Sequence, residues 1–162
     1  DVPILGICWG HQLLAQAFGG RVVDMGSYEI GYRSIEQRGD EPLFAGIDSP
    51  MTAFETHSDR VAELPAGAVE LARNEYGVQA FRLGASYGVQ FHPEYDRETA
   101  EWVTRGKDLP DDRIRAVLDG ITDDAVADAA VTTRLFDNFL AIAERHQPER
   151  QSPTRVRRRP RS

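Results

Sequence analysis

The sequence predicts an α/β fold, because three observations occur together. An apolar run at residues 2–7 is of the kind that forms a buried parallel strand. A helical pattern follows it directly, and short strand-like runs separated by turn residues then occupy residues 21–92. The last third of the chain has helical periodicity. With 162 residues, of which 41% are hydrophobic and 28% charged, the chain is long enough to bury one core.

The first helix is expected to follow the apolar run at once. Leu13, Leu14, Ala17 and Phe18 recur at helical spacing, and Gly19-Gly20 supplies a stop. The strand-like runs after it cover residues 21–23, 33–37, 51–57, 69–73, 78–83 and 86–92. A buried parallel strand needs neighbours, and none precedes residues 2–7, so either its neighbours come from later in the chain or the chain is a fragment. We expect a fragment without its N-terminal strands.

Two further helices are expected near the C-terminus. The segment 109–112 places a proline and two acids in a first helical turn, and Gly120 ends that helix. Thr122 begins a longer helix. Its apolar stripe comprises Ala129, Phe136, Phe139, Leu140 and Ala143. Residues 1–146 are therefore expected to form the domain, and residues 147–162 a disordered basic tail, either a solvated end or a docking arm.

Charge and cysteine content exclude several classes of protein. Six arginines and Glu149 give residues 147–162 a charge of +5, which leaves −12 on the other 146 residues. A body this acidic repels phosphate backbones, so we expect no nucleic-acid partner. The apolar runs are too short for a membrane span and the N-terminus lacks a signal-peptide pattern, so we expect a cytoplasmic protein with no membrane partner. The single cysteine, Cys8, excludes an internal disulfide and a multi-cysteine zinc cluster.

Cys8 lies in Gly6-Ile7-Cys8-Trp9-Gly10, at the junction of the first strand and the first helix. This spacing is that of a nucleophile elbow, with cysteine in the place of the nucleophile. The flanking glycines are expected to prevent clashes with the crossing chain. The positive end of the helix is expected to lower the pKa of the thiol and to stabilise an oxyanion. The alternative is a buried and inert structural cysteine.

A cysteine nucleophile needs a base, and the sequence offers four histidines. His92 ends the apolar run 88–91, at the sheet edge where open α/β folds place their sites, and Glu94 lies two residues on, where it can fix the imidazole tautomer. We expect His11 to point along its helix and His146 to be solvated. His57, within residues 56–59, is either a ligand-loop residue or a turn residue.

Two segments carry a resemblance to a known family. Gly6-Ile7-Cys8-Trp9-Gly10-His11-Gln12, together with Gly88-Val89-Gln90-Phe91-His92-Pro93-Glu94, closely resembles the class I (triad) glutamine amidotransferases. Residues 56–59 are similar to the substrate loop of that family, and Asn138-Phe139 to its closing helix. The resemblance implies a three-layer α/β fold with an open, mostly parallel, flavodoxin-like sheet. Residues 1–146 would then be a partial domain of this family.

The resemblance also implies an activity, the hydrolysis of glutamine to glutamate and ammonia, with ammonia passed to a synthase domain or subunit. Cys8 would attack the side-chain amide to form a glutamyl thioester, His92 would move protons, and Glu94 would orient His92. The backbone N–H of Trp9 would be an oxyanion donor. The residues implied in substrate binding are Gln12, Ser58 and Asp59. Since a thiolate is itself a competent nucleophile, neither a metal nor a cofactor is expected.

The sequence departs from the family in two respects. The loop that gives the second oxyanion donor would lie before Asp1. Because losing one donor costs about two to three orders of magnitude in rate, we expect the chain alone to be poorly active or unstable. Ser58 stands where the glutaminase of GMP synthetase has a glycine, so we predict a GMP-synthase-like domain with an unassigned ammonia acceptor. Two other interpretations stay open: a γ-glutamyl hydrolase-like cysteine peptidase, and a truncated non-catalytic regulatory domain.

Overall fold

The computed structural model describes residues 2–146, so the basic tail expected at residues 147–162 lies outside the described residues. The elements are β1 (Leu5–Ile7), α1 (Trp9–Ala17), β2 (Arg21–Gln37), the 3-10 helix η1 (Pro42–Phe44), β3 (Met51–Glu63), β4 (Val69–Asn74), β5 (Gly77–Leu83), β6 (Ser86–Val89), α2 (Arg97–Arg105), α3 (Asp111–Asp119), α4 (Asp123–Ala130), the 3-10 helix η2 (Val131–Thr133) and α5 (Arg134–Arg145).

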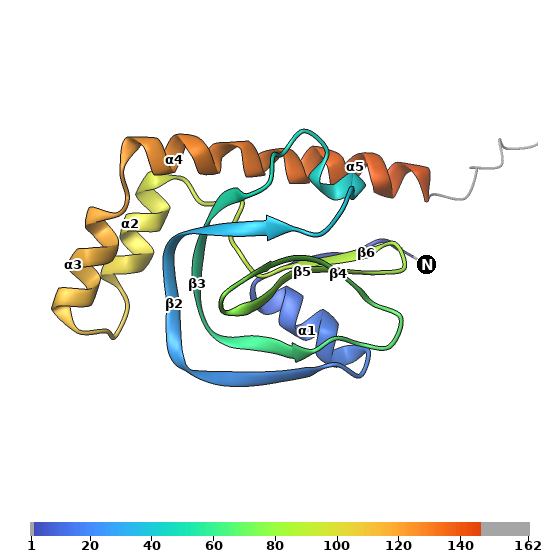
Figure 1. The fold of residues 1–162 in the computed structure, drawn as a ribbon, viewed down its shortest axis with the longest axis horizontal. Coiled ribbons are helices and arrows are strands. Elements are labelled where there is room, and N and C mark those ends of the chain that lie inside the picture. Colours follow the sequence, from blue (N-terminus) through green and yellow to red (C-terminus); the bar gives the residue numbers. More distant parts are fainter. Residues whose placement is uncertain (1, 147–162) are drawn as a thin grey trace, which may run out of the picture.

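The strands form one curled sheet in the order β1-β6-β5-β4-β2-β3 (Figure 1). β1 pairs with β6 in parallel, and every other neighbouring pair is antiparallel. The expected α/β class is confirmed, but the sheet within residues 2–146 differs from the mostly parallel one expected. One reason is the connections: two-residue turns join β4 to β5 and β5 to β6, and a turn this short pairs two strands antiparallel.

Helices cover the two faces of the sheet, so the expected three layers are present. α1 packs on one face, where Leu14 and Ala15 contact Val61, Val78 and Phe81. α5 and η1 cover the other face, on the opposite side from α1 in Figure 1. The core there includes Leu43, Phe44, Tyr87, Val89, Leu135 and Ile142. A third cluster, built on Ile30, Phe54, Ala100 and Ile121, packs the helical segment after residue 96 against the bent β2–β3 pair.

Several elements differ in extent from their sequence-based expectation. β2 is one strand of 17 residues where two short runs were expected, and it pairs with β3 through a register shift between Asp24 and Glu29. α2 was not expected at all. The expected long C-terminal helix is divided into α4, η2 and α5. Its buried apolar positions are Leu135 and Ile142, whereas Leu140, placed in the apolar stripe by its spacing, is 59% exposed.

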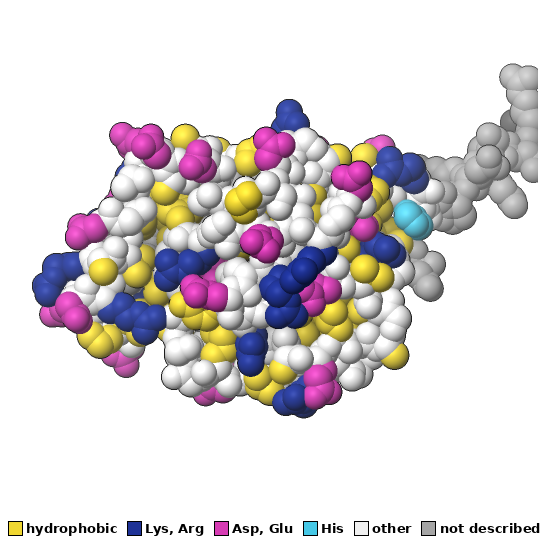
Figure 2. Space-filling view, viewed as in Figure 1, with side chains coloured by type: hydrophobic (Ala, Val, Ile, Leu, Met, Phe, Trp, Pro, Cys, Tyr) yellow, Lys and Arg dark blue, Asp and Glu magenta, His cyan; other side chains and the backbone are white. Residues whose placement is uncertain are grey.

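The surface of the described chain carries charges of both signs. Figure 2 shows acidic and basic side chains interspersed over one face. Some form ion pairs, such as Arg73 with Glu70 and Arg82 with Glu41. Within residues 2–146, no helix is both long enough and apolar enough to cross a membrane.

Candidate active site

Cys8 occupies a strained turn between β1 and α1. Its backbone angles are φ 52° and ψ −104°, and it is the one non-glycine residue of positive φ within residues 2–146. Its backbone N–H donates to the carbonyl of Val89 on β6, at 2.8 Å. Strain of this kind persists only where the surrounding structure imposes it, and it is found at functional sites. The elbow expected from the sequence is therefore formed.

The two glycines that flank Cys8 are not equivalent. A Cβ added to Gly6 would lie 2.5 Å from the carbonyl oxygen of Gly10, whereas a Cβ added to Gly10 would meet nothing within 4 Å. The expectation that both glycines prevent clashes is correct for Gly6 and wrong for Gly10. The first turn of α1 passes directly over β1, so only the residue beneath it lacks room for a side chain.

The thiol of Cys8 is held among polar groups. The side-chain amide of Gln90 donates to Sγ at 3.7 Å, and Sγ lies 4.0 Å from the carbonyl oxygen of Thr56. Burial and the nearby carboxylate of Glu55 raise the pKa of the Cys8 thiol to about 11. The backbone N–H of Trp9 lowers that pKa, as expected for a helix N-terminus, but burial outweighs it. The expectation of a lowered thiol pKa is therefore wrong.

His92 lies in the loop that follows β6, and its backbone and ring are both held. Its backbone N–H donates to the carbonyl of Phe54 on β3 at 2.9 Å, and its ring stacks on Tyr95 with centroids 4.2 Å apart. The Nδ1 atom is 2.7 Å from Oε1 of Glu94. The Nε2 atom is buried and has no partner within residues 2–146, where no hydrogen bond joins His92 to Cys8. Glu94 thus fixes the ring and leaves Nε2 available to exchange a proton.

The residues expected to bind substrate lie around the middle of β3. Gln12 is buried on α1, and its Nε2 atom donates to the carbonyl of Asp59 at 2.9 Å and to Oε1 of Gln90 at 3.2 Å. Gln12 is therefore a buried polar side chain whose amide nitrogen is held by two hydrogen bonds. Ser58 and Asp59 are half-buried. They belong to strand β3 rather than to the expected loop, because the strand continues through its bend opposite the register shift in β2.

The remaining histidines have different environments. His11 is buried beneath the sheet, 5.0 Å from the ring of Phe81, and burial lowers its pKa to about 3. It packs against the sheet rather than pointing along its helix, and it is neutral at pH 7. His146 is exposed, as expected, and its Nδ1 atom lies 2.8 Å from the carbonyl oxygen of Ile142. His57 is also buried, and it lies within strand β3 rather than in the loop or turn that the sequence suggested.

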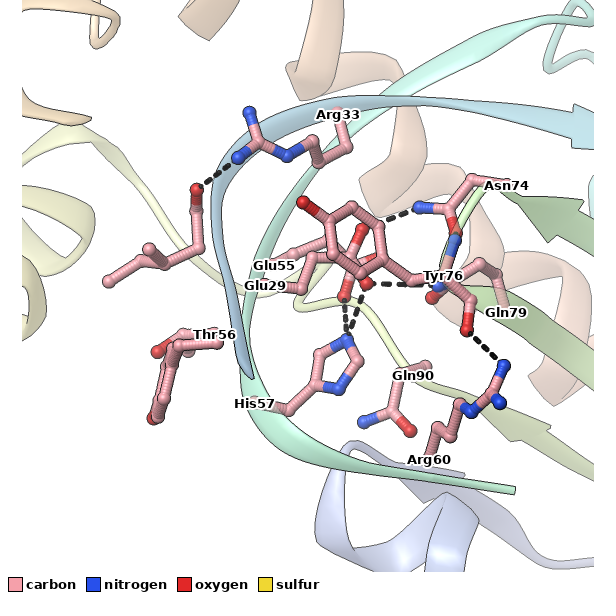
Figure 3. A network of polar contacts seen from close by, with 12 residues as sticks. Glu29, Arg33, Glu55, Thr56, His57, Arg60, Asn74, Tyr76, Gln79 and Gln90 are labelled. Atoms are coloured by element: carbon pink, nitrogen blue, oxygen red, sulfur yellow. Dashed lines mark hydrogen bonds and ion pairs between the residues drawn. The ribbon is translucent and has the colours of Figure 1, made fainter. Parts of the chain in front are cut away.

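His57 forms a cluster with two buried glutamates that the sequence motifs did not indicate. Its Nε2 atom is 2.8 Å from Oε2 of Glu29 and 3.2 Å from Oε2 of Glu55 (Figure 3). One ligand atom from each residue lies within 4.8 Å of the others, a spacing that a metal ion could also use. A signal was available in the sequence: Glu55 stands two residues from His57 in an apolar strand, on the same face.

Comparison with known proteins identifies the family. Residues 1–103 match the family model described as "Glutamine amidotransferase class-I". The chain belongs to this family. Among curated relatives, it is 36% identical over 96 residues to GMP synthase [glutamine-hydrolyzing] of Aliivibrio fischeri (strain MJ11) and to that of Vibrio cholerae (strain M66-2). The matched region is 57% of this chain and 19% of each relative.

Solved structures of glutamine amidotransferases have a fold similar to that of this chain. A glutamine amidotransferase from Thermotoga maritima has a TM-score of 0.72 and 30% identity, with 88% of this chain and 63% of that chain covered. A glutamine amidotransferase from Methylobacillus flagellatus has a TM-score of 0.70 and 27% identity, with 88% and 62% covered. The class I glutamine amidotransferase fold and a relationship to GMP synthases are therefore established. The chain spans about a fifth of the curated relatives and about three fifths of these structures.

Proposed function

We propose that this class I glutamine amidotransferase domain hydrolyses glutamine to glutamate and ammonia through Cys8, His92 and Glu94. The observation that carries the proposal is the strained backbone of Cys8, which projects a thiol from a strand-to-helix turn in a member of this family. The contact of 2.7 Å between His92 and Glu94 supports it, because a base must be oriented before it can move a proton.

In the proposed reaction, Sγ of Cys8 attacks the side-chain amide carbon of glutamine. A carbon–sulfur bond forms as the carbon–nitrogen bond breaks, and the thiol proton passes through Nε2 of His92 to the departing nitrogen, which leaves as ammonia. Water, deprotonated by His92, then cleaves the glutamyl thioester to give glutamate and restore the thiol. The backbone N–H of Trp9 stabilises the oxyanion. Because the pKa of Cys8 is about 11, the thiolate forms by proton transfer during attack rather than standing ready at pH 7.

Substrate binding is assigned to Gln12, Ser58 and Asp59. The Nε2 atom of Gln12 is already engaged by the carbonyl of Asp59, so in this proposal Gln12 acts partly by holding the β3 backbone. Ser58 and Asp59, both half-buried on that strand, would hold the amino-acid end of glutamine.

The ammonia is proposed to pass to a synthase domain or subunit of the GMP-synthase type. The support is that curated relatives are glutamine-hydrolysing GMP synthases of which this chain matches about a fifth, so most of each relative lies outside the matched region. A cytoplasmic location belongs to the same proposal.

The test is glutamate formation by the full chain, measured with glutamine and with a γ-glutamyl peptide as separate substrates. We expect glutamate from glutamine, a loss to background in Cys8→Ala, and no change in the control Glu63→Gln, whose carboxylate lies on the exposed end of β3. Turnover of the peptide in preference to glutamine would favour a γ-glutamyl hydrolase instead. Equal product from the wild-type chain and Cys8→Ala would contradict the proposed chemistry.

A further inference from the structure

The buried cluster of Glu29, Glu55 and His57 joins strands β2 and β3 at the centre of the molecule. Glu29 and His57 are direct register partners, and Glu55 lies two residues from His57 on the same face of β3. The side chains of both glutamates are fully buried, and that of His57 is 3% exposed. Figure 3 shows the imidazole pointing at the two carboxylates. A buried charge without a partner is costly, so the three groups stabilise one another only as a set.

The protons of the cluster can be assigned from its contacts. The Nδ1 atom of His57 lies 2.7 Å from the carbonyl oxygen of Asp59, which can only accept, so Nδ1 carries a proton. Burial alone would lower the pKa of His57, but the Glu29 and Glu55 carboxylates beside its Nε2 atom outweigh burial and raise that pKa to about 10. Burial raises the pKa of Glu55 to about 8, against the opposing effect of His57. His57 is therefore an imidazolium at pH 7.

The cluster is tied to the rest of the sheet through Glu29. This carboxylate accepts from Nδ2 of Asn74 on β4 at 2.5 Å and from Nε2 of Gln79 on β5 at 3.1 Å. Four neighbouring strands thus meet at one group of side chains. Movement of β3 relative to the sheet would break contacts to a buried charge, which makes the strand rigid at this point.

The backbone of β3 contacts three groups of the active site at the same place. The carbonyl of Phe54 accepts from the backbone N–H of His92, that of Thr56 faces the thiol of Cys8, and that of Asp59 accepts from Gln12. Along the strand, Glu55 lies between Phe54 and Thr56, and His57 directly follows Thr56. The carbonyl of Asp59 also accepts from His57, so the cluster and Gln12 share an acceptor.

We propose that the Glu29–His57–Glu55 cluster is a positioning device, which fixes β3 so that its carbonyl groups hold the nucleophile, the base and Gln12 in register. This inference rests on the proposed function and adds residues to it that do not touch the reacting atoms. Glu55 has a second effect, because its carboxylate acts through space on the thiol of Cys8.

The charged groups around the pair formed by Glu55 and Cys8 come from several elements. Glu94 in the loop after β6 also raises the pKa of Cys8, and Lys107 in the loop after α2 lowers it. Tyr95 is close enough for Cys8 to raise the pKa of its hydroxyl, although burial is the larger cause. On the cluster side, Arg33 on β2 acts on Glu55, and the neutral ring of His11 on α1 faces His57. Replacing Glu55 removes a negative charge from this set and leaves the other groups in place.

The experiment is the pH dependence of Cys8 alkylation by iodoacetamide in the full chain, compared among the wild type, Glu55→Gln and the control Glu63→Gln. Cys8 is the sole cysteine, so the reaction reports one thiol. Glutamine is isosteric with the protonated carboxyl that prevails below the pKa of Glu55, so the variant should fold. We expect the midpoint of its profile to fall by about one pH unit, with no shift in the control. At pH 9, above the pKa of Glu55, the wild type carries a carboxylate at this position and the variant a neutral amide, so the kcat for glutamine should fall at least about tenfold there, with less change in KM.

Two results would overturn the proposal. One is a Glu55→Gln chain with the alkylation midpoint and the kcat of the wild type. The other concerns the wild type alone. Nitrogen NMR of the four histidines should show one imidazolium that persists at pH 9. Four neutral rings at that pH would refute the ion cluster, and this includes the case in which His57 is neutral because it binds a metal ion. If the midpoint shifts but no version makes glutamate, then the link between the cluster and the thiol stands and the proposed function fails.

Discussion

The elbow at Cys8 gives a sharp prediction, because the same substitution at its two flanking glycines should have opposite effects. In Gly6→Ala, the new Cβ would lie 2.5 Å from the carbonyl oxygen and 2.6 Å from the carbonyl carbon of Gly10. Ordinary contact begins at 3.4 Å, so β1 and α1 must separate by about 0.9 Å. In Gly10→Ala, the new methyl group meets nothing within 4 Å, at a helical position that favours alanine.

The magnitudes follow from these distances. Overpacking costs about 1–3 kcal/mol, and the upper end applies to Gly6→Ala because the obstructing atoms are backbone and cannot rotate away. For a chain of this size, about 3 kcal/mol lowers the Tm by roughly 6–12 °C. Gly10→Ala should instead gain up to about 0.5–1 kcal/mol, the difference between alanine and glycine within a helix.

The assay is unfolding by urea, followed by circular dichroism, with the rate of Cys8 alkylation measured on each folded variant. We expect Gly6→Ala to unfold at lower urea and to alter the alkylation rate, since a shift of α1 moves the thiol relative to Gln90 and Thr56. Gly10→Ala should be at least as stable as the wild type. Equal stability of the two variants would refute the steric argument for the elbow.

Three further predictions concern the base, the core and pH. Glu94→Gln should lower glutamate formation by about two to four orders of magnitude, since a neutral amide neither fixes the tautomer of His92 nor stabilises its imidazolium, while Cys8 alkylation persists; an unchanged rate would remove Glu94 from the mechanism. Leu135→Ala, at a fully buried side chain, should cost about 2–5 kcal/mol in urea unfolding, and a loss below about 1 kcal/mol would contradict the packing of α5 on the sheet. The pKa of His57 is raised to about 10, against 6.5 in the unfolded chain, so its contribution to stability is full below pH 6.5 and is lost as the pH rises through 10. The Tm should therefore fall steadily from pH 7 to pH 9, and a rise over this range would contradict an imidazolium at His57.

Much of the site could be predicted from the sequence because its groups are carried by local motifs. The strand-to-helix junction at Cys8 is encoded by the apolar run before it and the helical spacing after it, and the structure forms the strained turn there. His92 and Glu94 are two residues apart, so their contact depends on one short loop and little else.

The sheet was harder to predict, because its pairing depends on long-range contacts. Residues 24–32 lie between two expected strand-like runs, yet β2 continues through them, since β3 pairs with β2 on both sides of the register shift between Asp24 and Glu29. The same pairing brings Glu29 against His57, 28 positions along the chain. No local spacing relates these two residues, so the part that Glu29 takes in the cluster could not be predicted from either segment alone.

Burial also determined two features that residue type alone did not predict, the pKa of the Cys8 thiol and the buried face of α5. The positive end of α1 favours a low thiol pKa, but the depth of Cys8 and the nearby Glu55 depend on how β3 folds over the elbow. Leu140 fits the helical stripe by spacing, yet α5 turns Leu135 and Ile142 towards the sheet instead.

The central claim is that Cys8 is the nucleophile of a formed glutamine pocket. The measurement that tests it most directly is the intact mass of the full chain after exposure to a glutamine analogue that carries an electrophile, with and without excess glutamine, and with Cys8→Ala beside it. We predict one adduct in the wild type, blocked by glutamine and absent from the variant. An adduct that glutamine does not block, or one that also forms in Cys8→Ala, would contradict the claim.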